Sequence, residues 1–431
     1  MDRERIVALD KERVWHPYTA MDDYRASVDP IVVDRAEGPF LFDVDGRRYI
    51  DANSSWWVAS LGHNHPRLVE ALKRQADRNC HSALAGMTHE PAVELAERLC
   101  AVAPDGLDVV FYSDDGSTAV EVALKAALQF WDQSGRPERK RFVALQEAFH
   151  GETLGVASVG GVELFRRPFA GAMPQNFFVP TPAQAGGLEP ARDALGRALE
   201  KHGTTVAAVV MEPVVQGAAG MQIYDPAFVR AARELCDEHD VLLILDEVFT
   251  GYGRTGPMWA CQLAGVVPDL LCTAKGFSGG ILPMAATLVN DKVFQGFLGD
   301  RDRAFYYGHS FCGNPLGAAV AVEVLRVYEE EGILESARPK ARRISQAFEA
   351  LGKQPAVAGS RARGMIGALD LAGDSGYLAD AGWRVYEEAR QRGAYLRPMG
   401  NVVYVTPPLN IPDDTLDELL EIVSESVGKL S

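Results

Sequence analysis

Short apolar runs, separated by segments of helical periodicity, constrain the fold of this 431-residue chain more than any other feature. A run of four to six apolar residues without polar alternation is typical of a strand that is buried on both faces. Such runs predict strands at 109–112, 142–145, 206–211, 241–245, 270–273 and 285–289. The segments between them predict helices, among them 66–78, 91–102, 117–131 and 226–239. Strand, helix, strand at this spacing indicates parallel βαβ units with helices on both faces of the sheet, an α/β fold.

The pattern changes near both ends of the chain. After Pro315 the sequence predicts helices at 316–328, 335–351, 377–392 and from 413, with extended segments at 364–371 and 395–405. The first fifty or so residues alternate short apolar runs with turn signals such as Asp45-Gly46, which predicts a hairpin-rich arm. We expect an N-terminal arm (1–60), a large domain (61–315) and a smaller α+β domain (316–431) that the arm completes.

Composition narrows the classes of function. The chain is 47% hydrophobic and 24% charged, as in an ordinary soluble enzyme. A formal charge of -16 argues against a nucleic-acid partner, because a phosphate backbone needs a basic surface. The six cysteines form no C-x-x-C pair or Cys/His cluster, so no metal site is expected. Residues 1–10 lack the uninterrupted apolar core of a signal peptide, and no later stretch is long and apolar enough to span a bilayer, so the expected location is the cytoplasm.

Two residues that follow buried strands carry the chemistry. Asp246 ends the run that begins at Val241, and Lys275 follows the strand that begins after Pro268-Asp269. Either residue alone is most often structural, as a helix cap or a surface cation. Both are followed by glycine-rich segments, which let a bulky group approach the backbone. An amine that bonds an aldehyde and a carboxylate that keeps a pyridinium nitrogen protonated are what a pyridoxal phosphate site requires.

Further candidates surround this pair. Gly116 and Ser117 open a helix directly after a strand, and free backbone N–H groups there can bind a phosphate. Phe149, before His150-Gly151, can stack on one face of the cofactor ring, and Val248 can cover the other. Glu212 ends the strand that begins at Val206. We expect its side chain to hold residues on the substrate side of the site without contacting the substrate.

These motifs occur together in order from about Trp15 to the last helix. They include Asp114 to Glu121, Phe149-His150-Gly151, Met211-Glu212-Pro213, Gly251 to Gly256, Lys275-Gly276 and Gly308 to Pro315. The set resembles the class III aminotransferases of pyridoxal phosphate fold type I. Trp15 to Thr19, Ser54 to Trp57 and Leu396 to Gly400 resemble, more narrowly, the branch that aminates 8-amino-7-oxononanoate in biotin synthesis.

The resemblance implies a large domain with a mostly parallel seven-stranded sheet, and a homodimer with shared active sites. It implies catalytic roles for Lys275, Asp246 and Tyr18, and a substrate pocket formed by Tyr18, Trp56, Trp57, Phe149, Gly308 and Arg397. Arg397 would pair the carboxylate at the far end of the substrate. The cofactor would be bound by Gly116, Ser117, Phe149, His150, Glu212, Asp246, Val248 and Lys275, and its phosphate by Gly308 and Ser310 of the other subunit.

Three positions depart from the pattern of that branch. Asp115 stands where serine is common and puts a carboxylate near the phosphate unless its side chain turns away. Phe149 replaces a tyrosine, and His309 stands where relatives that use S-adenosylmethionine often have proline. The amino donor can therefore be S-adenosylmethionine or lysine. Two other functions remain compatible with the sequence. One is an ω-aminotransferase acting on diamines or ω-amino acids, and the other is a pyridoxal phosphate isomerase or racemase.

Overall fold

The computed structural model describes residues 1–430 and is built around a seven-stranded sheet. The strand order is β4-β12-β11-β10-β7-β5-β6. Strands β11, β10, β7, β5 and β6 run parallel to one another, whereas β12 is antiparallel to both β11 and β4. The bounds are β4 Val109–Ser113, β5 Arg141–Leu145, β6 Phe177–Val179, β7 Val206–Met211, β10 Leu242–Asp246, β11 Leu270–Thr273 and β12 Ala285–Val289. The expected α/β class and the mostly parallel seven-stranded sheet are confirmed.

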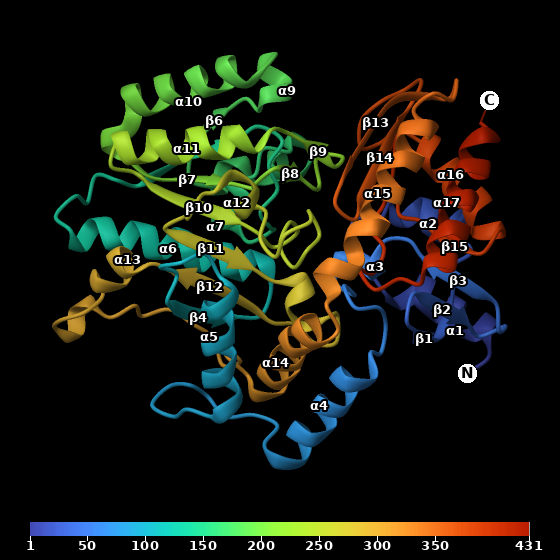
Figure 1. Ribbon diagram of the computed structural model, residues 1–431, viewed down its shortest axis with the longest axis horizontal. Coiled ribbons are helices and arrows are strands. Elements are labelled where there is room, and N and C mark those ends of the chain that lie inside the picture. The colour runs from blue at the N-terminus through green and yellow to red at the C-terminus, as the bar shows by residue number, and fades with distance from the viewer. Residues whose placement is uncertain (431) are drawn as a thin grey trace.

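Helices cover both faces of this sheet, as the βαβ pattern predicts (Figure 1). Alternate residues of β10 point to opposite faces. Leu242 and Ile244 pack in a cluster with residues of α6 (Gly116–Gln133), whereas Leu243 and Leu245 share a cluster with residues of α11 (Pro226–Glu238). Burial on both faces explains why β10 contains no polar residue before its last position, Asp246.

The remaining helices of this lobe lie around the sheet. Helix α14 (Pro315–Glu330) contacts α4 (Pro66–Arg78) and α5 (Glu90–Val102), and α10 (Leu188–His202) packs beside α11. The short helices of this lobe are α7 Leu154–Ala157, α8 Glu163–Arg166, α9 Pro182–Ala185, α12 Cys261–Ala264 and α13 Asp291–Gln295, whereas α3 (Ser54–Trp57) belongs to the N-terminal arm. A two-stranded hairpin joins β8 (Val215–Gln216) to β9 (Gln222–Ile223).

The second lobe contains both ends of the chain (Figure 1). One sheet has the order β1-β2-β3-β15, with bounds Val33–Glu37, Phe40–Asp43, Arg48–Asp51 and Ala394–Tyr395. The other is β13-β14-β16, with bounds Val357–Arg363, Ile366–Leu371 and Val402–Val405. Helices α15 Ile333–Leu351, α16 Ala381–Gln391 and α17 Asp413–Gly428 complete it. The parallel pairing of β15 with β3 supports the proposal that residues 1–60 complete the smaller domain.

The start of the arm differs from the expectation of hairpins. Helices α1 (Arg3–Arg13) and α2 (Met21–Ser27) precede β1, and only the later part of the arm forms hairpins, with Asp45-Gly46 in the turn between β2 and β3. Helix α1 buries none of its residues, so it lacks the apolar stripe by which a helix is recognised. Its start is fixed instead by Asp2, whose side chain accepts the Arg5 N–H. Strand β6 was not predicted because three residues at a sheet edge give no periodic signal.

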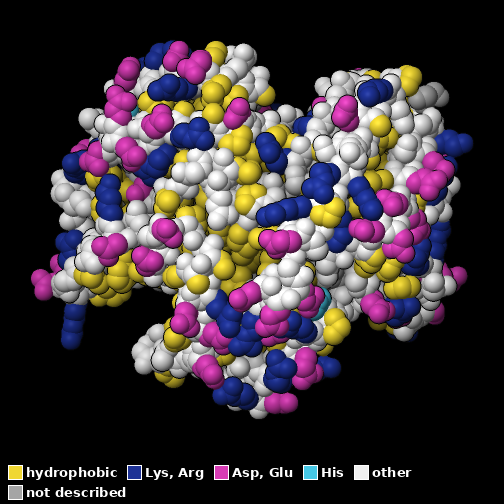
Figure 2. All heavy atoms as spheres, viewed as in Figure 1, with side chains coloured by type: hydrophobic (Ala, Val, Ile, Leu, Met, Phe, Trp, Pro, Cys, Tyr) yellow, Lys and Arg dark blue, Asp and Glu magenta, His cyan; other side chains and the backbone are white. Residues whose placement is uncertain are grey.

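The surface carries charges of both signs. Figure 2 shows basic and acidic side chains interspersed on one face, with hydrophobic side chains gathered toward the notch between the lobes. Within residues 1–430, no helix is both long and apolar enough to cross a bilayer.

Candidate active site

The carboxyl ends of β10 and β11 bring Asp246 and Lys275 into one cavity. The two strands are parallel neighbours with Asp246 opposite Cys272, and Lys275 follows β11 by two residues. Both side chains line a cavity of about 150 Å³. Ligands of open α/β sheets bind at this edge, because loops leave the sheet there and open a crevice.

Lys275 is buried, and burial lowers the pKa of its amine, although the charges of Asp246 and Glu212 act in the opposite direction. Its Nζ lies 5.2 Å from the centroid of the Trp57 ring. Its backbone φ is +51°, a left-handed conformation that a non-glycine residue adopts at a cost of order 1 kcal/mol. A lysine with a depressed pKa offers the neutral amine that a nucleophile or base requires.

Asp246 is held by His150. Nδ1 of His150 lies 2.7 Å from Oδ2 of Asp246, and Oδ1 of Asp246 accepts the N–H of Val248 at 3.0 Å. Burial would lower the pKa of His150, but the hydrogen bond and the charge of Asp246 outweigh it and raise the pKa. The two contacts hold the Asp246 carboxylate in one orientation at the end of β10.

Glu212 ties together two loops that border the smaller cavity. Oε1 accepts the N–H of Phe149 at 3.0 Å, and Oε2 accepts the N–H of Gly217 at 2.9 Å. Complete burial raises the pKa of Glu212 to about 7. The side chain lines the smaller cavity, and its contacts hold the Phe149 loop and the loop that carries Ala218.

Helix α6 begins at Gly116, shortly after β4, and Asp115 caps it. The Asp115 carboxylate accepts the N–H of Thr118 at 2.9 Å, and the Thr118 hydroxyl lies 3.0 Å from the N–H of Asp115. The side chain therefore turns to its own helix, although Asp115 still borders both cavities. The first N–H groups of a helix have no partner within it, so those of Gly116 and Ser117 remain for an anion.

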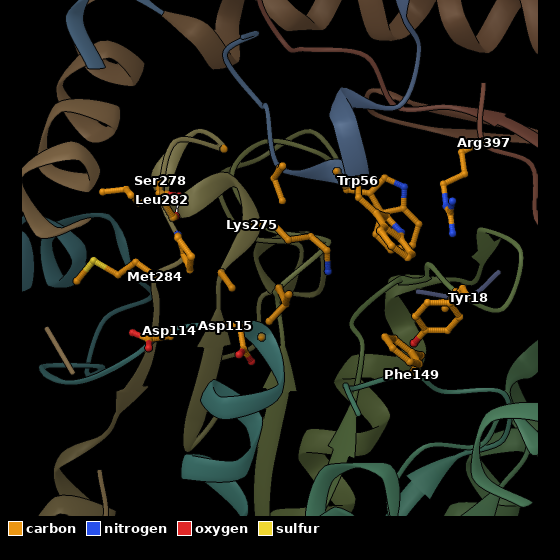
Figure 3. A pocket seen from close by; sticks show the side chains of 18 of the residues that line it. Tyr18, Trp56, Asp114, Asp115, Phe149, Lys275, Ser278, Leu282, Met284 and Arg397 are labelled. Carbon is orange, nitrogen blue, oxygen red and sulfur yellow. Dashed lines mark hydrogen bonds between the residues drawn. The ribbon is translucent and has the colours of Figure 1, made fainter. Parts of the chain in front are cut away.

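A second cavity of about 510 Å³ adjoins the first and shares Lys275, Trp57, Phe149 and Val248 with it. In Figure 3, Tyr18, Trp56, Phe149 and Arg397 lie on one side of Lys275, and Asp114, Ser278, Leu282 and Met284 lie on the other. The Arg397 guanidinium carbon lies 4.1 Å from the centroid of the Trp56 ring. The structure thus brings the predicted Tyr18, Trp56, Trp57, Phe149 and Arg397 together.

Glu152, Phe165 and Tyr377 lie near the predicted residues on this side of the cavity but were not predicted from the sequence. The Tyr18 hydroxyl donates a hydrogen bond to Glu152, and burial, followed by this bond, raises the pKa of Tyr18. Phe165 packs edge-on against Tyr18 and Phe149, at 5.3 and 5.9 Å between ring centroids, and against Tyr377 at 5.1 Å. Glu152 follows the Phe149-His150-Gly151 motif directly, which is the one signal that could have identified it.

Gly308 and Ser310 lie apart from the other predicted residues. Both are exposed, and neither borders the two cavities of this chain. Between them, His309 Nδ1 lies 3.5 Å from Asp114 Oδ2. The fold of a single chain therefore does not bring Gly308 and Ser310 to Lys275.

The smaller cavity fits a flat, phosphate-bearing cofactor with an aldehyde and a basic ring nitrogen. It presents a buried amine, a buried carboxylate and a helix start, and Phe149 and Val248 both border it. A Cβ on Gly151 would lie 2.2 Å from Ser117 Oγ, and one on Gly116 would lie 2.7 Å from Val248 Cγ1. Glycine at these two positions therefore leaves room at the start of α6, beside Ser117 and Val248.

Comparisons with known proteins identify the family of this chain. The model of the class III aminotransferase family matches residues 23–427. The adenosylmethionine-8-amino-7-oxononanoate aminotransferase of Geobacter sulfurreducens is 40% identical, with 99% of this chain and 98% of that protein covered. The enzyme of the same name from Nitratidesulfovibrio vulgaris is 42% identical, over 98% of this chain and 81% of that protein.

Solved structures give the same result. A crystal structure of the adenosylmethionine-8-amino-7-oxononanoate aminotransferase from Methanocaldococcus jannaschii superposes with a TM-score of 0.95 at 36% identity, covering 99% of both chains. An (S)-enantioselective ω-transaminase from Thermomicrobium roseum also gives 0.95, at 28% identity, over 100% of this chain and 99% of that one. The family match and the curated relatives show that the chain belongs to the class III aminotransferases.

Proposed function

We propose that the protein is a pyridoxal phosphate-dependent aminotransferase that converts 8-amino-7-oxononanoate to 7,8-diaminononanoate in biotin synthesis. The observation that carries this proposal is the position of Arg397 beside Trp56, across an apolar cavity from Lys275. A substrate with a ketone near one end, a methylene chain and a carboxylate at the other end suits that arrangement. The names of the relatives that match almost the full chain support the same substrate.

The cofactor would occupy the smaller cavity. Asp246 would contact the ring nitrogen, Phe149 and Val248 would lie on the two ring faces, and Gly116 and Ser117 would bind the phosphate. His150 and Glu212 would hold Asp246 and Phe149 in place. When bound, pyridoxal phosphate supplies an aldehyde for an amino group and a ring that withdraws electrons from the adjacent carbon.

Lys275 would bind the aldehyde at rest and act as the base during turnover. Its Nζ would take the proton from the carbon that bears the donor's amino group and hold it for return, while the bound cofactor would supply the electron-withdrawing ring. Burial lowers the pKa of Lys275, which keeps the amine able to accept that proton. The same base would serve both half-reactions, with S-adenosylmethionine or lysine as the donor in the first.

The larger cavity would hold the acceptor. Arg397 would pair the carboxylate through two parallel N–H bonds, and the indoles of Trp56 and Trp57 would pack against the methylene chain. Tyr18, whose hydroxyl donates to Glu152, would close the side of the pocket toward the Phe149 loop.

Gly308 and Ser310 would bind the cofactor phosphate of a second copy in a homodimer. Their exposure and their distance from the cavities of their own chain support this assignment. Sedimentation of the purified protein should show a dimer, and a stable monomer with full activity would contradict it. The expected cytoplasmic location stays a prediction.

Replacing Arg397 tests the proposed substrate. Arg397→Ala should raise the KM for 8-amino-7-oxononanoate at least about tenfold, the usual cost of a lost hydrogen bond to a charged group. Arg392→Ala is a matched control, because Arg392 pairs with Glu388 and Glu425 and borders neither cavity. An unchanged KM in Arg397→Ala, or no formation of diaminononanoate by the native protein, would refute the assignment.

An ω-aminotransferase acting on diamines or ω-amino acids is the second candidate. The fold of the ω-transaminase from Thermomicrobium roseum, with its TM-score of 0.95, supports it. Measuring kcat/KM for 8-amino-7-oxononanoate beside putrescine and β-alanine separates the two candidates. Release of a keto product from the donor separates both from an isomerase or racemase, which needs no second substrate.

A further inference from the structure

Asn53 stands at the start of α3, but its side chain does not cap that helix. The residue is fully buried, and its carboxamide reaches two other segments. Oδ1 accepts the backbone N–H of Arg397 at 2.7 Å, and Nδ2 donates to the carbonyl oxygen of Tyr404 at 3.2 Å. One side chain thus joins the turn that carries Trp56 and Trp57 to the backbone of Arg397 and to β16.

The turn that begins at Asn53 has a costly backbone conformation, so contacts with other segments must stabilise it. Ser54, Ser55 and Trp57 have φ of +50°, +62° and +69°, a left-handed conformation that is costly for residues with a Cβ. Ser54 Oγ donates to the carbonyl of Thr406 at 2.8 Å, and Trp57 Nε1 donates to the Tyr404 hydroxyl at 3.1 Å. The turn is therefore held by Asp51, which accepts the N–H groups of Asn53 and Ser55, and by β16 with the residue that follows it, which Asn53, Ser54 and Trp57 contact.

Arg397 is the residue whose backbone N–H Asn53 binds. Its guanidinium carbon lies 4.1 Å from the Trp56 ring centroid, and both side chains border the larger cavity. A long side chain has many rotamers, so its reach depends on where its backbone is fixed. The 2.7 Å bond to Asn53 fixes that point relative to the turn that carries Trp56.

We propose that Asn53 is a positioning residue that sets the place of the Arg397 guanidinium relative to Trp56 and so determines the affinity for the acceptor's carboxylate. The inference rests on the proposed function, in which Arg397 pairs that carboxylate. Asn53 itself borders neither cavity and acts through Arg397 and the turn.

Equilibrium binding of two unreactive probes to the holoenzyme tests the proposal. Nonanoate carries the carboxylate and the methylene chain, and nonan-1-ol carries the chain alone. Arg397→Ala should raise the Kd of nonanoate about tenfold or more, and Asn53→Ala should raise it about three- to tenfold, with little change for nonan-1-ol. In turnover, Asn53→Ala should raise the acceptor KM and leave the donor half-reaction unchanged.

Asn176→Ala is a matched control. Its carboxamide also bridges two backbone segments, because Oδ1 accepts the Phe142 N–H at 3.0 Å and Nδ2 lies 3.2 Å from the Ser158 carbonyl. It lies at the amino-terminal edge of the large sheet, away from the cavities. It should lower the melting temperature much as Asn53→Ala does and leave both Kd values at the native level.

The double variant Asn53→Ala/Arg397→Ala shows whether Asn53 acts through Arg397. Nonanoate should bind it no more weakly than it binds Arg397→Ala, because a positioning effect vanishes with the group that is positioned. Additive losses would overturn the proposal, as would an equal loss for both probes in Asn53→Ala. If Arg397→Ala leaves the nonanoate Kd unchanged, the proposed carboxylate contact fails, and this is distinct from a failure of Asn53 alone.

Asn53→Asp keeps the test decisive if Asn53→Ala does not fold. An aspartate retains an oxygen for the Arg397 N–H, loses the donor to Tyr404 and places a carboxylate where the carboxamide stood. The nonanoate Kd should rise less than in Arg397→Ala while nonan-1-ol binding stays native. An unchanged nonanoate Kd together with weaker nonan-1-ol binding would overturn the proposal.

Discussion

Nδ1 of His150 lies 2.7 Å from Oδ2 of Asp246, and both side chains are buried. The pair places a hydrogen-bonded carboxylate at the end of β10, opposite the lysine that follows β11. A carboxylate that already has one buried hydrogen-bond partner is held in a single orientation.

Removing His150 should therefore weaken cofactor binding. We expect His150→Ala to raise the Kd of pyridoxal phosphate at least about tenfold, because Asp246 loses a charge-assisted hydrogen bond. Absorbance titration of the cofactor-free protein measures this Kd. His202→Ala, which loses only a ring stacked on Phe177 at 4.1 Å, should keep the native value, and equal losses in the two variants would contradict the role of His150.

Asp115 combines a stabilising cap with an unfavourable charge. Asp115→Ser should keep the bond to the Thr118 N–H and remove the carboxylate, so pyridoxal phosphate should bind a few times more tightly at unchanged melting temperature. Asp115→Ala should lose about 1 kcal/mol of stability with the cap. Weaker cofactor binding in Asp115→Ser would show that the carboxylate does not oppose the phosphate.

Glu212 should make folding stability depend on pH. Burial raises its pKa to about 7 in the folded protein, from 4.5, so the folded state binds the extra proton. The stability that this proton contributes is fully present below about pH 4.5 and is lost as the pH rises through about 7. Glu212→Gln should remove this part of the slope of unfolding free energy between about pH 5 and 7, measured by urea denaturation of the cofactor-free protein. An unchanged slope would show that Glu212 is ionised throughout this range.

The sequence predicts the site best where strands end. Asp246 and Lys275 could be placed together because parallel strands deliver their carboxyl ends to one edge, and the apolar runs before them mark those strands. The predicted phosphate-binding role of Gly116 and Ser117 rests on the helix that begins at these residues. The structure adds that Asp115 faces its own helix, which depends on a local bond to Thr118.

Contacts between distant segments could not be predicted in this way. Glu152 meets Tyr18 across 134 residues, and Asn53 meets Arg397 across 344. The left-handed conformations of Ser54, Ser55 and Trp57 follow no propensity of these residues, because tertiary contacts hold them. Helix α1 was not predicted either, because none of its residues is buried and its charged sequence has no apolar face.

The most direct test of the site is to locate the covalently bound cofactor. The purified protein is incubated with pyridoxal phosphate, reduced with borohydride and digested, and the modified peptide is identified by mass spectrometry. We predict a phosphopyridoxyl group on Lys275, and loss of both this label and turnover in Lys275→Ala. A label on another lysine, or normal turnover by Lys275→Ala, would contradict the account.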